Sequence, residues 1–234
     1  MARRPAIEIT KVAQMRGHKD AIYDFVLDKE NRTIYSAGAE GYVVKWEMDH
    51  PENGELVLPG GESIYSIWKN GDRLRLGSRS GKIYTVALSE KNLIGTQQVH
   101  NGGVFFIRDQ MSGGEDGALH WVDEGASSKH VASESLRCIV EYMNSFFVGA
   151  SDNSIYEIDK ESNAILSKFE GHTNSVFAVE MLDKNTLVST GRDAYIRAWD
   201  LTIGKEVHAV PAHDYQVKSL SWNGNLLLSC SMDK

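Results

Sequence analysis

The sequence of 234 residues predicts an all-β fold made of repeated antiparallel units. Three observations support this: a unit of about 40 residues recurs, its apolar runs are short and rich in β-branched and aromatic residues, and Gly, Asn and Asp separate these runs. Such runs are typical of strands joined by tight turns. A recurring unit of this length indicates that the chain folds as an array of similar modules.

The repeat is clearest in residues 169–200, which begin near Gly171-His172 and end at Trp199-Asp200. Each copy can be aligned on a short turn, and the last residues of these turns lie 36 to 41 positions apart: Glu40, Ser80, Asp116, Asp152, Asp193 and Asp233. A large apolar residue follows six positions after each of the first five markers: Trp46, Val86, Val122, Ile158 and Trp199. The shared register predicts six copies, of which the last is partial because the sequence given stops at Lys234.

Four strands are predicted in each complete copy. An apolar run follows the Gly-His position, a second run precedes the turn, and a third follows it. A fourth run before the next Gly-His position is more polar, which suits an outer edge strand.

A repeat of four strands that begins near a Gly-His pair and ends near a Trp-Asp pair resembles the repeat of the WD40 family of β-propellers. The resemblance covers essentially the whole chain and is closest in copies one and five. It implies a single propeller domain over residues 1–234, with five complete four-stranded blades, a partial sixth blade and a C-terminus that is incomplete. It also implies that residues 7–15 form the outer strand that closes the ring.

Two interpretations of the ring remain open. A seven-bladed propeller would need roughly 60 more residues, so the chain can be a piece of a longer propeller. Alternatively, residues 1–15 complete a sixth blade, although Pro5 makes that segment a poor strand. An open ring would expose apolar sheet faces at both ends and favour self-association.

The composition of the chain bears on which partners it binds and in which compartment it is found. The net charge of −7 argues against a nucleic-acid-binding surface, which is usually basic. The sequence contains no run of 18 apolar residues, so no membrane span is predicted. The N-terminus has no apolar region of the kind found in signal peptides. Cys138 and Cys230 fall in predicted core strands, so we expect buried free thiols and a cytoplasmic protein.

Histidine, serine and acidic residues recur at the same positions of several copies. Copy five has His172, Ser189, Asp193 and Trp199, and copy six has His213, Ser229 and Asp233. Copy one has His18, Ser36, Glu40 and Trp46. A Ser-His-Asp catalytic triad would need to occur only once, whereas this set follows the repeat. The resemblance implies a structural hydrogen-bond chain, so we expect no catalytic residues. Copies two to four lack the full set, so we expect those blades to be held more by packing alone.

Other chemistry is not indicated by the sequence. Zinc, P-loop and EF-hand motifs are absent, so no cofactor and no metal is expected. The Gly-rich segment 112–117 is interpreted as a β-turn. Four further histidines are interpreted as edge or surface residues: His100, His120, His130 and His208.

A binding surface is predicted where the first strands begin. Propellers of the resembled family are platforms for proteins or peptides, and one residue near the start of each first strand should point to the channel mouth. These residues are Tyr23, Tyr65, Phe105, Arg137, Phe177 and Lys218. Arg79 and Arg192, which precede turn markers, would join them, so an acidic or aromatic peptide is the expected ligand. The alternative is that these aromatic rings pack between blades.

Three functions are compatible with these features. The first is a non-catalytic scaffold that binds protein or peptide partners through the loop face and the channel rim. The second is an incomplete propeller that self-associates to complete its ring. The third is a hydrolase with a site at the channel mouth, for which no single convergent polar set is found.

Overall fold

A computed structural model describes residues 10–122 and 127–233, and every regular element in these ranges is a β-strand. Five sheets have four antiparallel strands each, and a sixth has two. The predicted all-β fold, with five complete blades and a partial sixth, is therefore confirmed.

The strands of each blade follow one another from the inner strand to the outer strand. Blade one contains β1 (Ile22–Asp28), β2 (Thr33–Gly38), β3 (Val43–Glu47) and β4 (His50–Leu58). Blade two contains β5 (Ile64–Asn70), β6 (Arg73–Ser78), β7 (Lys82–Ala87) and β8 (Asn92–Gln98). Blade three contains β9 (Val104–Arg108), β10 (Met111–Gly114), β11 (Ala118–Trp121) and β12 (Ser128–His130).

The second half of the chain continues this order. Blade four contains β13 (Leu136–Tyr142), β14 (Ser145–Ala150), β15 (Ser154–Asp159) and β16 (Ile165–Glu170). Blade five contains β17 (Val176–Met181), β18 (Thr186–Gly191), β19 (Tyr195–Asp200) and β20 (Lys205–Pro211). The two-stranded blade six contains β21 (Val217–Trp222) and β22 (Leu227–Ser231).

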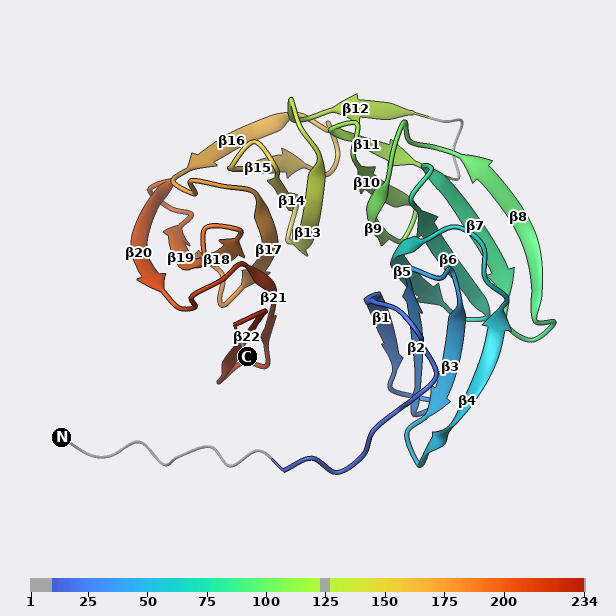
Figure 1. Cartoon of the computed structure of the whole chain (residues 1–234). Helices are drawn as coiled ribbons and strands as arrows, with labels where there is room; N and C mark the ends of the chain where they lie inside the picture. Colours follow the sequence, from blue (N-terminus) through green and yellow to red (C-terminus); the bar gives the residue numbers. More distant parts are fainter. Residues whose placement is uncertain (1–9, 123–126, 234) are drawn as a thin grey trace.

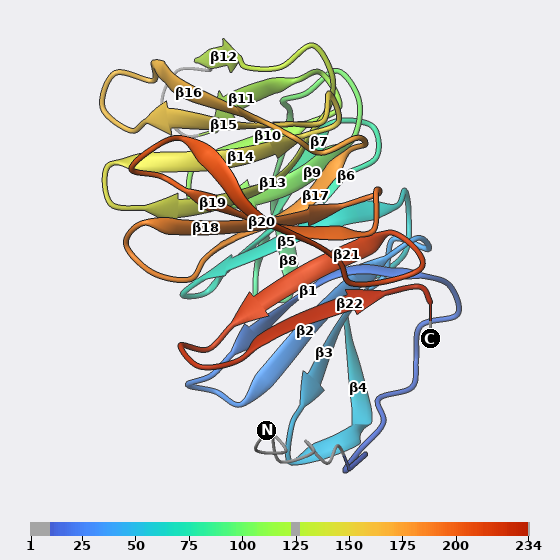
Figure 2. The ribbon, with the colours of Figure 1, turned by 90° about the vertical axis from the view of Figure 1, so that its left-hand side faces the viewer.

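The blades are arranged around a central axis as an open ring, with blades one and six on either side of the opening (Figure 1). Seen from the side, successive sheets pack as layers (Figure 2). Inner strands of consecutive blades contact one another, β1 with β5 and β17 with β21 among them. The core therefore lies between neighbouring sheets. One cluster, for example, joins Leu136, Ile139 and Val148 of blade four to Phe106 and Leu119 of blade three.

Blade six is attached to blade five by packing and by a side-chain hydrogen bond. The Trp222 indole Nε1 donates to the Leu182 carbonyl oxygen at 3.0 Å. The other face of β22 carries exposed Leu228 and Cys230. The expectation of a buried thiol is therefore wrong for Cys230, because no sheet covers that face. Cys138 is protected, and burial raises the pKa of its thiol to about 12.

The predicted closing strand at the N-terminus is not formed. Residues 10–20 contain no strand, and residues 7–9 lie outside the described ranges. The physical reason is that an outermost strand needs a third strand to pair with, whereas the sheet of blade six has two strands.

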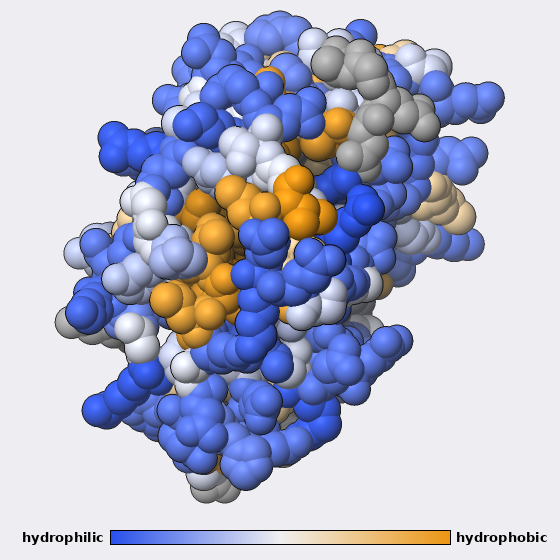
Figure 3. All heavy atoms as spheres, turned by 90° about the vertical axis from the view of Figure 1, so that its right-hand side faces the viewer, coloured by the Kyte–Doolittle hydropathy of each residue, from blue (hydrophilic) through white to orange (hydrophobic). Residues whose placement is uncertain are grey.

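The side of the ring that carries β4 and β8 is mostly hydrophilic, as expected for polar fourth strands (Figure 3). An apolar area interrupts this hydrophilic surface (Figure 3). Exposed apolar side chains of these two strands include Leu56, Leu93 and Ile94. In residues 10–122 and 127–233, no helix is long and apolar enough to cross a membrane.

Candidate functional site

Blade five contains a buried chain of hydrogen bonds that links two strands, a turn and a loop. The Trp199 indole Nε1 lies 2.7 Å from the Ser189 hydroxyl, which lies 2.7 Å from His172 Nε2. His172 Nδ1 lies 2.9 Å from Asp193 Oδ2. An indole N–H can only donate and a carboxylate can only accept. The chain therefore runs in one direction: Trp199 donates to Ser189, Ser189 donates to His172, and His172 Nδ1–H donates to Asp193.

This geometry explains why the set is structural in blade five. Ser189 is fully buried and His172 is 6% exposed, so a substrate has no access to the hydroxyl. A nucleophilic serine needs room for a reacting carbon next to its oxygen, and here that side is occupied by Trp199. The chain instead connects β18, β19, the turn and the loop before β17.

Blades one and six have the same arrangement with small differences. In blade one, His18 lies 2.8 Å from Glu40 and 2.7 Å from Ser36, which accepts a hydrogen bond from Trp46. In blade six, His213 Nδ1 and Nε2 each lie 2.8 Å from their partners, Asp233 and Ser229. We call these sets the blade networks.

The expectation that blades two to four depend on packing alone is wrong. In blade three, His100 Nδ1 lies 2.9 Å from Asp116 and its Nε2 lies 2.9 Å from Ser112. His100 is 2% exposed, so it is not a surface residue. In blade four, the Tyr156 hydroxyl donates to Asp152 at 2.6 Å. In blade two, the Glu62 carboxylate accepts from the Tyr84 and Ser80 hydroxyls.

The segment 112–117 is also only partly the turn that was expected. Ser112–Gly114 belong to β10, and the turn follows at residues 115–117. A Cβ atom on Gly113 would lie 2.2 Å from the Phe106 ring, so the strand needs a glycine there. The missing side chain made this strand hard to recognise in the sequence.

The turn carboxylates are held ionised by the networks. Burial alone would raise the pKa of Asp193, but hydrogen bonds from His172 and from the amides of Thr173 and Tyr195 outweigh it and lower the pKa. The pKa values of Glu40, Asp116 and Asp233 are lowered as well, with hydrogen bonds from their histidines among the causes. The charge therefore stabilises each turn.

The six residues predicted to face the channel mouth occupy a common backbone position. Each is the second residue of a first strand, and each falls at a β-bulge, where the ladder skips it. In blade one, for example, Ile22 pairs with Gly38 and Asp24 with Ala37, so Tyr23 has no partner. A bulge redirects a side chain out of the strand alternation. These rim residues are Tyr23, Tyr65, Phe105, Arg137, Phe177 and Lys218.

The rim residues surround an open cavity of about 990 Å³. All six line it, together with Arg79, Glu115 and Met232. Arg192 is not among the lining residues, although its charge acts on Arg137 and Lys218.

Three neighbouring aromatic rings are followed along the cavity wall by a cation, a fourth ring and a second cation. Tyr65 stacks on Phe105 at 5.7 Å between centroids, and Tyr23 meets Tyr65 edge-on at 5.1 Å. The Arg137 guanidinium lies 4.1 Å from the centroid of Phe105, and the Lys218 ammonium 4.7 Å from that of Phe177. The structure has features of both interpretations of these rings. Rings from neighbouring blades pack on one another, and the same rings line the cavity.

The cations of this surface are crowded. Burial, followed by the charges of Arg137 and Arg192, lowers the pKa of Lys218. Burial also lowers the pKa of Arg137, although Glu115 and Glu134 act against it. Because the charges repel one another, an anionic group bound between them would be stabilised.

The comparison with known protein families matches the blades described above. The family model "WD domain, G-beta repeat" matches residues 163–200 and 204–234, which cover blade five with its complete network and the start of blade six. The same network recurs in blade one. Residues 163–200 and 204–234 are therefore WD40 repeats, and the blades before them share the same four-stranded architecture.

Curated relatives of this WD40 chain include several larger proteins. Protein SPA1-RELATED 3 of Arabidopsis thaliana is 28% identical over 230 residues, covering 88% of this chain and 27% of the relative. Ribosome biogenesis protein YTM1 of Lodderomyces elongisporus is 21% identical over 251 residues, covering 95% of this chain and 50% of the relative. Pre-mRNA-processing factor 19 of Bos taurus is 36% identical over 94 residues, which cover 39% of this chain and 19% of the relative. The WD40 chain thus spans at most half the length of these relatives.

Proposed function

We propose that this WD40 chain is a non-catalytic scaffold that binds an acidic protein segment containing an aromatic residue at its rim cavity. The observation that carries the proposal is the bulge repeated in every blade, which turns four aromatic side chains and two cations toward one cavity. Its relatives include a ribosome biogenesis protein and a pre-mRNA-processing factor, which supports a role in protein assemblies.

The chemistry of the rim favours this class of ligand. Arginine and large aromatic side chains dominate the binding energy of protein interfaces, because they bury much area with few rotatable bonds. The half-buried Arg137 is held over Phe105, and its Nε donates to the Ser151 hydroxyl at 2.7 Å. A ligand carboxylate would meet a guanidinium that is already oriented, so little further ordering is needed.

The test is the affinity of a fluorescein-labelled peptide of four glutamates around one phenylalanine, measured by fluorescence anisotropy. The rim double variant Arg137→Gln with Lys218→Gln is expected to bind at least about 10-fold more weakly than the wild type, because each lost charge pair removes on the order of 1 kcal/mol or more. A peptide with glutamines in place of the glutamates should bind weakly to both proteins.

The matched control removes two positive charges away from the rim. Arg32 and Lys91 are exposed cations, with side-chain exposures of 60% and 61%. The variant Arg32→Gln with Lys91→Gln has the same net charge as the rim variant and should keep wild-type affinity. Equal losses in the two variants, or no binding by the wild type, would contradict the proposal.

A second candidate function is self-association through the ends of the open ring. The inner strand of blade one exposes Ile22 by 53% and Phe25 by 63%, and blade six exposes Leu228 by 56%. Apolar faces of this kind are sites of association. Light scattering on a sizing column would show a defined oligomer in this case, and a monomer near 26.0 kDa would contradict it.

The charge of the chain also bears on its compartment and on other classes of partner. We propose a cytoplasmic scaffold that binds neither nucleic acid nor membrane, supported by the acidic net charge of −7. The hydrolase alternative with a site at the channel mouth is not favoured, because the described residues that line the rim cavity include no serine, cysteine or histidine.

A further inference from the structure

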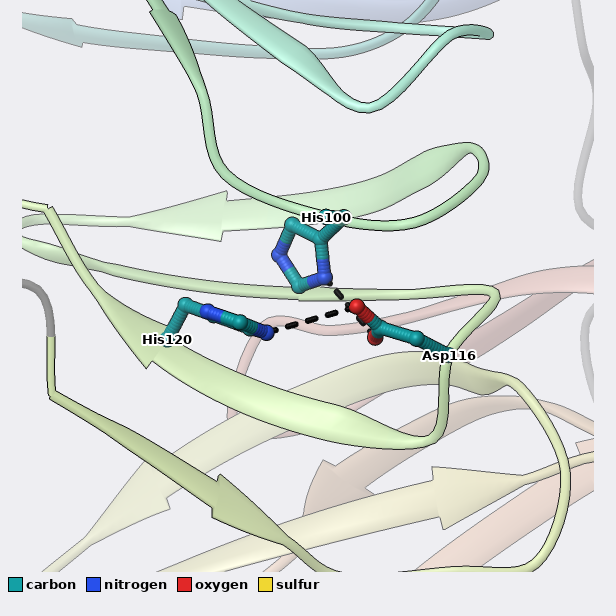
Figure 4. A group of neighbouring side chains, drawn as sticks. All are labelled: His100, Asp116 and His120. Atoms are coloured by element: carbon teal, nitrogen blue, oxygen red, sulfur yellow. Dashed lines mark hydrogen bonds and ion pairs between the residues drawn. The ribbon is translucent and has the colours of Figure 1, made fainter.

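Blade three contains an unusual group of three side chains. His100 of the loop before β9, Asp116 of the turn and His120 of β11 point toward one another (Figure 4). His100 Nδ1 lies 2.9 Å from Asp116 Oδ1, and His120 Nε2 lies 3.3 Å from Asp116 Oδ2. One ligand atom from each residue can be chosen so that all three lie within 4.8 Å of one another.

His120 occupies a position that other blades use differently. The residue four positions after the turn marker is Tyr84 in blade two, Tyr156 in blade four and Arg197 in blade five. Tyr156 and Arg197 each contact the carboxylate of their own turn, through a phenol hydroxyl and a guanidinium respectively. Both groups keep their protons at neutral pH and offer no lone pair to a metal ion as an imidazole does. Blade three places an imidazole there, which can bind a metal ion.

The missing tryptophan of blade three also changes what His100 can do. In blade five, Trp199 donates to Ser189 and occupies one of the two acceptor lone pairs of the serine oxygen. His172 Nδ1–H donates to Asp193, and Nε2 accepts from the serine hydroxyl. In blade three, Val122 stands at the tryptophan position and has no N–H to donate. In the metal-free protein His100 Nδ1–H donates to Asp116, whereas a metal ion bound at Nδ1 would leave the ring proton on Nε2, where the Ser112 oxygen can accept it.

We propose that His100 Nδ1, Asp116 and His120 Nε2 form a binding site for a divalent transition metal ion, with Zn²⁺ the best fit. Two imidazoles and one carboxylate are common zinc ligands, at about 2.0–2.2 Å from the metal. Ligand atoms of a tetrahedral ion with such bonds lie roughly 3.3 Å apart, close to the spacing of Asp116 and His120. Ser112 would orient His100 as a second partner of the ligating ring, as metal-binding histidines usually require.

The site is reachable from solvent. The Asp116 and His120 side chains are 18% and 21% exposed, whereas that of His100 is fully buried. The fourth position of the ion would face outward and hold water. The ion would tie the loop at His100 to the turn at Asp116 and to β11, in a blade whose hydrogen-bond set has no tryptophan.

The test is isothermal titration of the protein with ZnCl₂ in a Cys230→Ser background, which removes the exposed thiol. We expect one zinc ion per chain in the wild type. The affinity for zinc should be about 100-fold weaker in His120→Tyr, because loss of a ligand costs at least as much as loss of a residue that hydrogen-bonds to a ligand. The tyrosine reproduces the residue of blades two and four at this position, so the blade should fold. His208→Gln removes an exposed histidine on β20 and should leave the affinity unchanged.

A second measurement identifies the ligands independently of affinity. Co²⁺ bound in place of Zn²⁺ should give the strong visible absorption of a four-coordinate site in the wild type, and this absorption should be absent in His120→Tyr. If His120→Tyr does not fold, as judged by circular dichroism, His120→Arg reproduces the residue of blade five. Absence of zinc binding by the wild type, or equal binding by the His120 variants, would overturn the proposal and leave a hydrogen-bonded group only.

Discussion

The blade networks and the rim residues are both recurring positions of one repeat, yet the structure uses them in opposite ways. Network positions keep the same residue types in blades one, five and six, apart from Glu40, and those of blade five are buried, as with His172 and Ser189. Rim positions change from tyrosine to phenylalanine, arginine and lysine, and they border a cavity. The fold of the repeat therefore restricts the residue types inside a blade, where side chains must pack and hydrogen-bond. The side chain at the bulge lines the cavity, so its residue type can vary with the ligand.

The largest effect on stability should come from breaking the network of blade five. His172→Ala leaves the Ser189 hydroxyl and the Asp193 carboxylate without their histidine partner, which should lower the free energy of unfolding by about 3 kcal/mol. The same change in blade six, His213→Ala, should cost about 1 kcal/mol, because the His213 side chain is 19% exposed and water can replace it. Urea unfolding checks both, and equal losses would contradict the role assigned to burial.

A smaller effect is expected from the first donor of the chain. Trp199→Phe keeps most of the buried ring but removes the Nε1–H that donates to Ser189. The free energy of unfolding should fall by about 1–2 kcal/mol, and peptide binding at the rim should be unchanged. A change in peptide affinity in this variant would show that network and rim are not independent.

The smallest effect concerns acid. The pKa of Asp193 is lowered in the folded protein from its ordinary value of 3.8, so its contribution to stability is present above that value. The contribution is lost as the pH falls below 3.8 and through the folded-state pKa. Asp193→Asn should therefore show a shallower loss of unfolding free energy between pH 5 and pH 3 than the wild type does. Parallel pH profiles for the two proteins would argue against an ionised, hydrogen-bonded Asp193.

Much of this arrangement could be predicted from the sequence because the repeat register carries it. The spacing of the turn markers located five complete blades and one partial blade, and the position after the first apolar residue of each first strand located the side chains that line the cavity. The bulge at that position was not foreseen, because one unpaired residue leaves no signal in an alternating pattern.

The misses have local physical reasons. His100 stands at the Gly-His position of its repeat, and Ser112 precedes the marker Asp116 by four residues, as Ser189 precedes Asp193. Val99 in place of the glycine and Val122 in place of the tryptophan obscured this match, so burial of His100 was not predicted. Cys230 lies on an apolar strand, which indicates burial only if a neighbouring sheet covers it. Residues 10–15 read as a strand, but a strand forms only where it has a partner to pair with.

Hydrogen exchange followed by mass spectrometry, with and without the acidic phenylalanine peptide, tests the rim proposal most directly because it locates the contact. The account predicts slower exchange at the starts of the first strands, which are residues 21–24, 63–66, 103–106, 135–138, 175–178 and 216–219. Protection confined to the outer strands β4, β8, β16 and β20, or to none of the chain at saturating peptide, would contradict it.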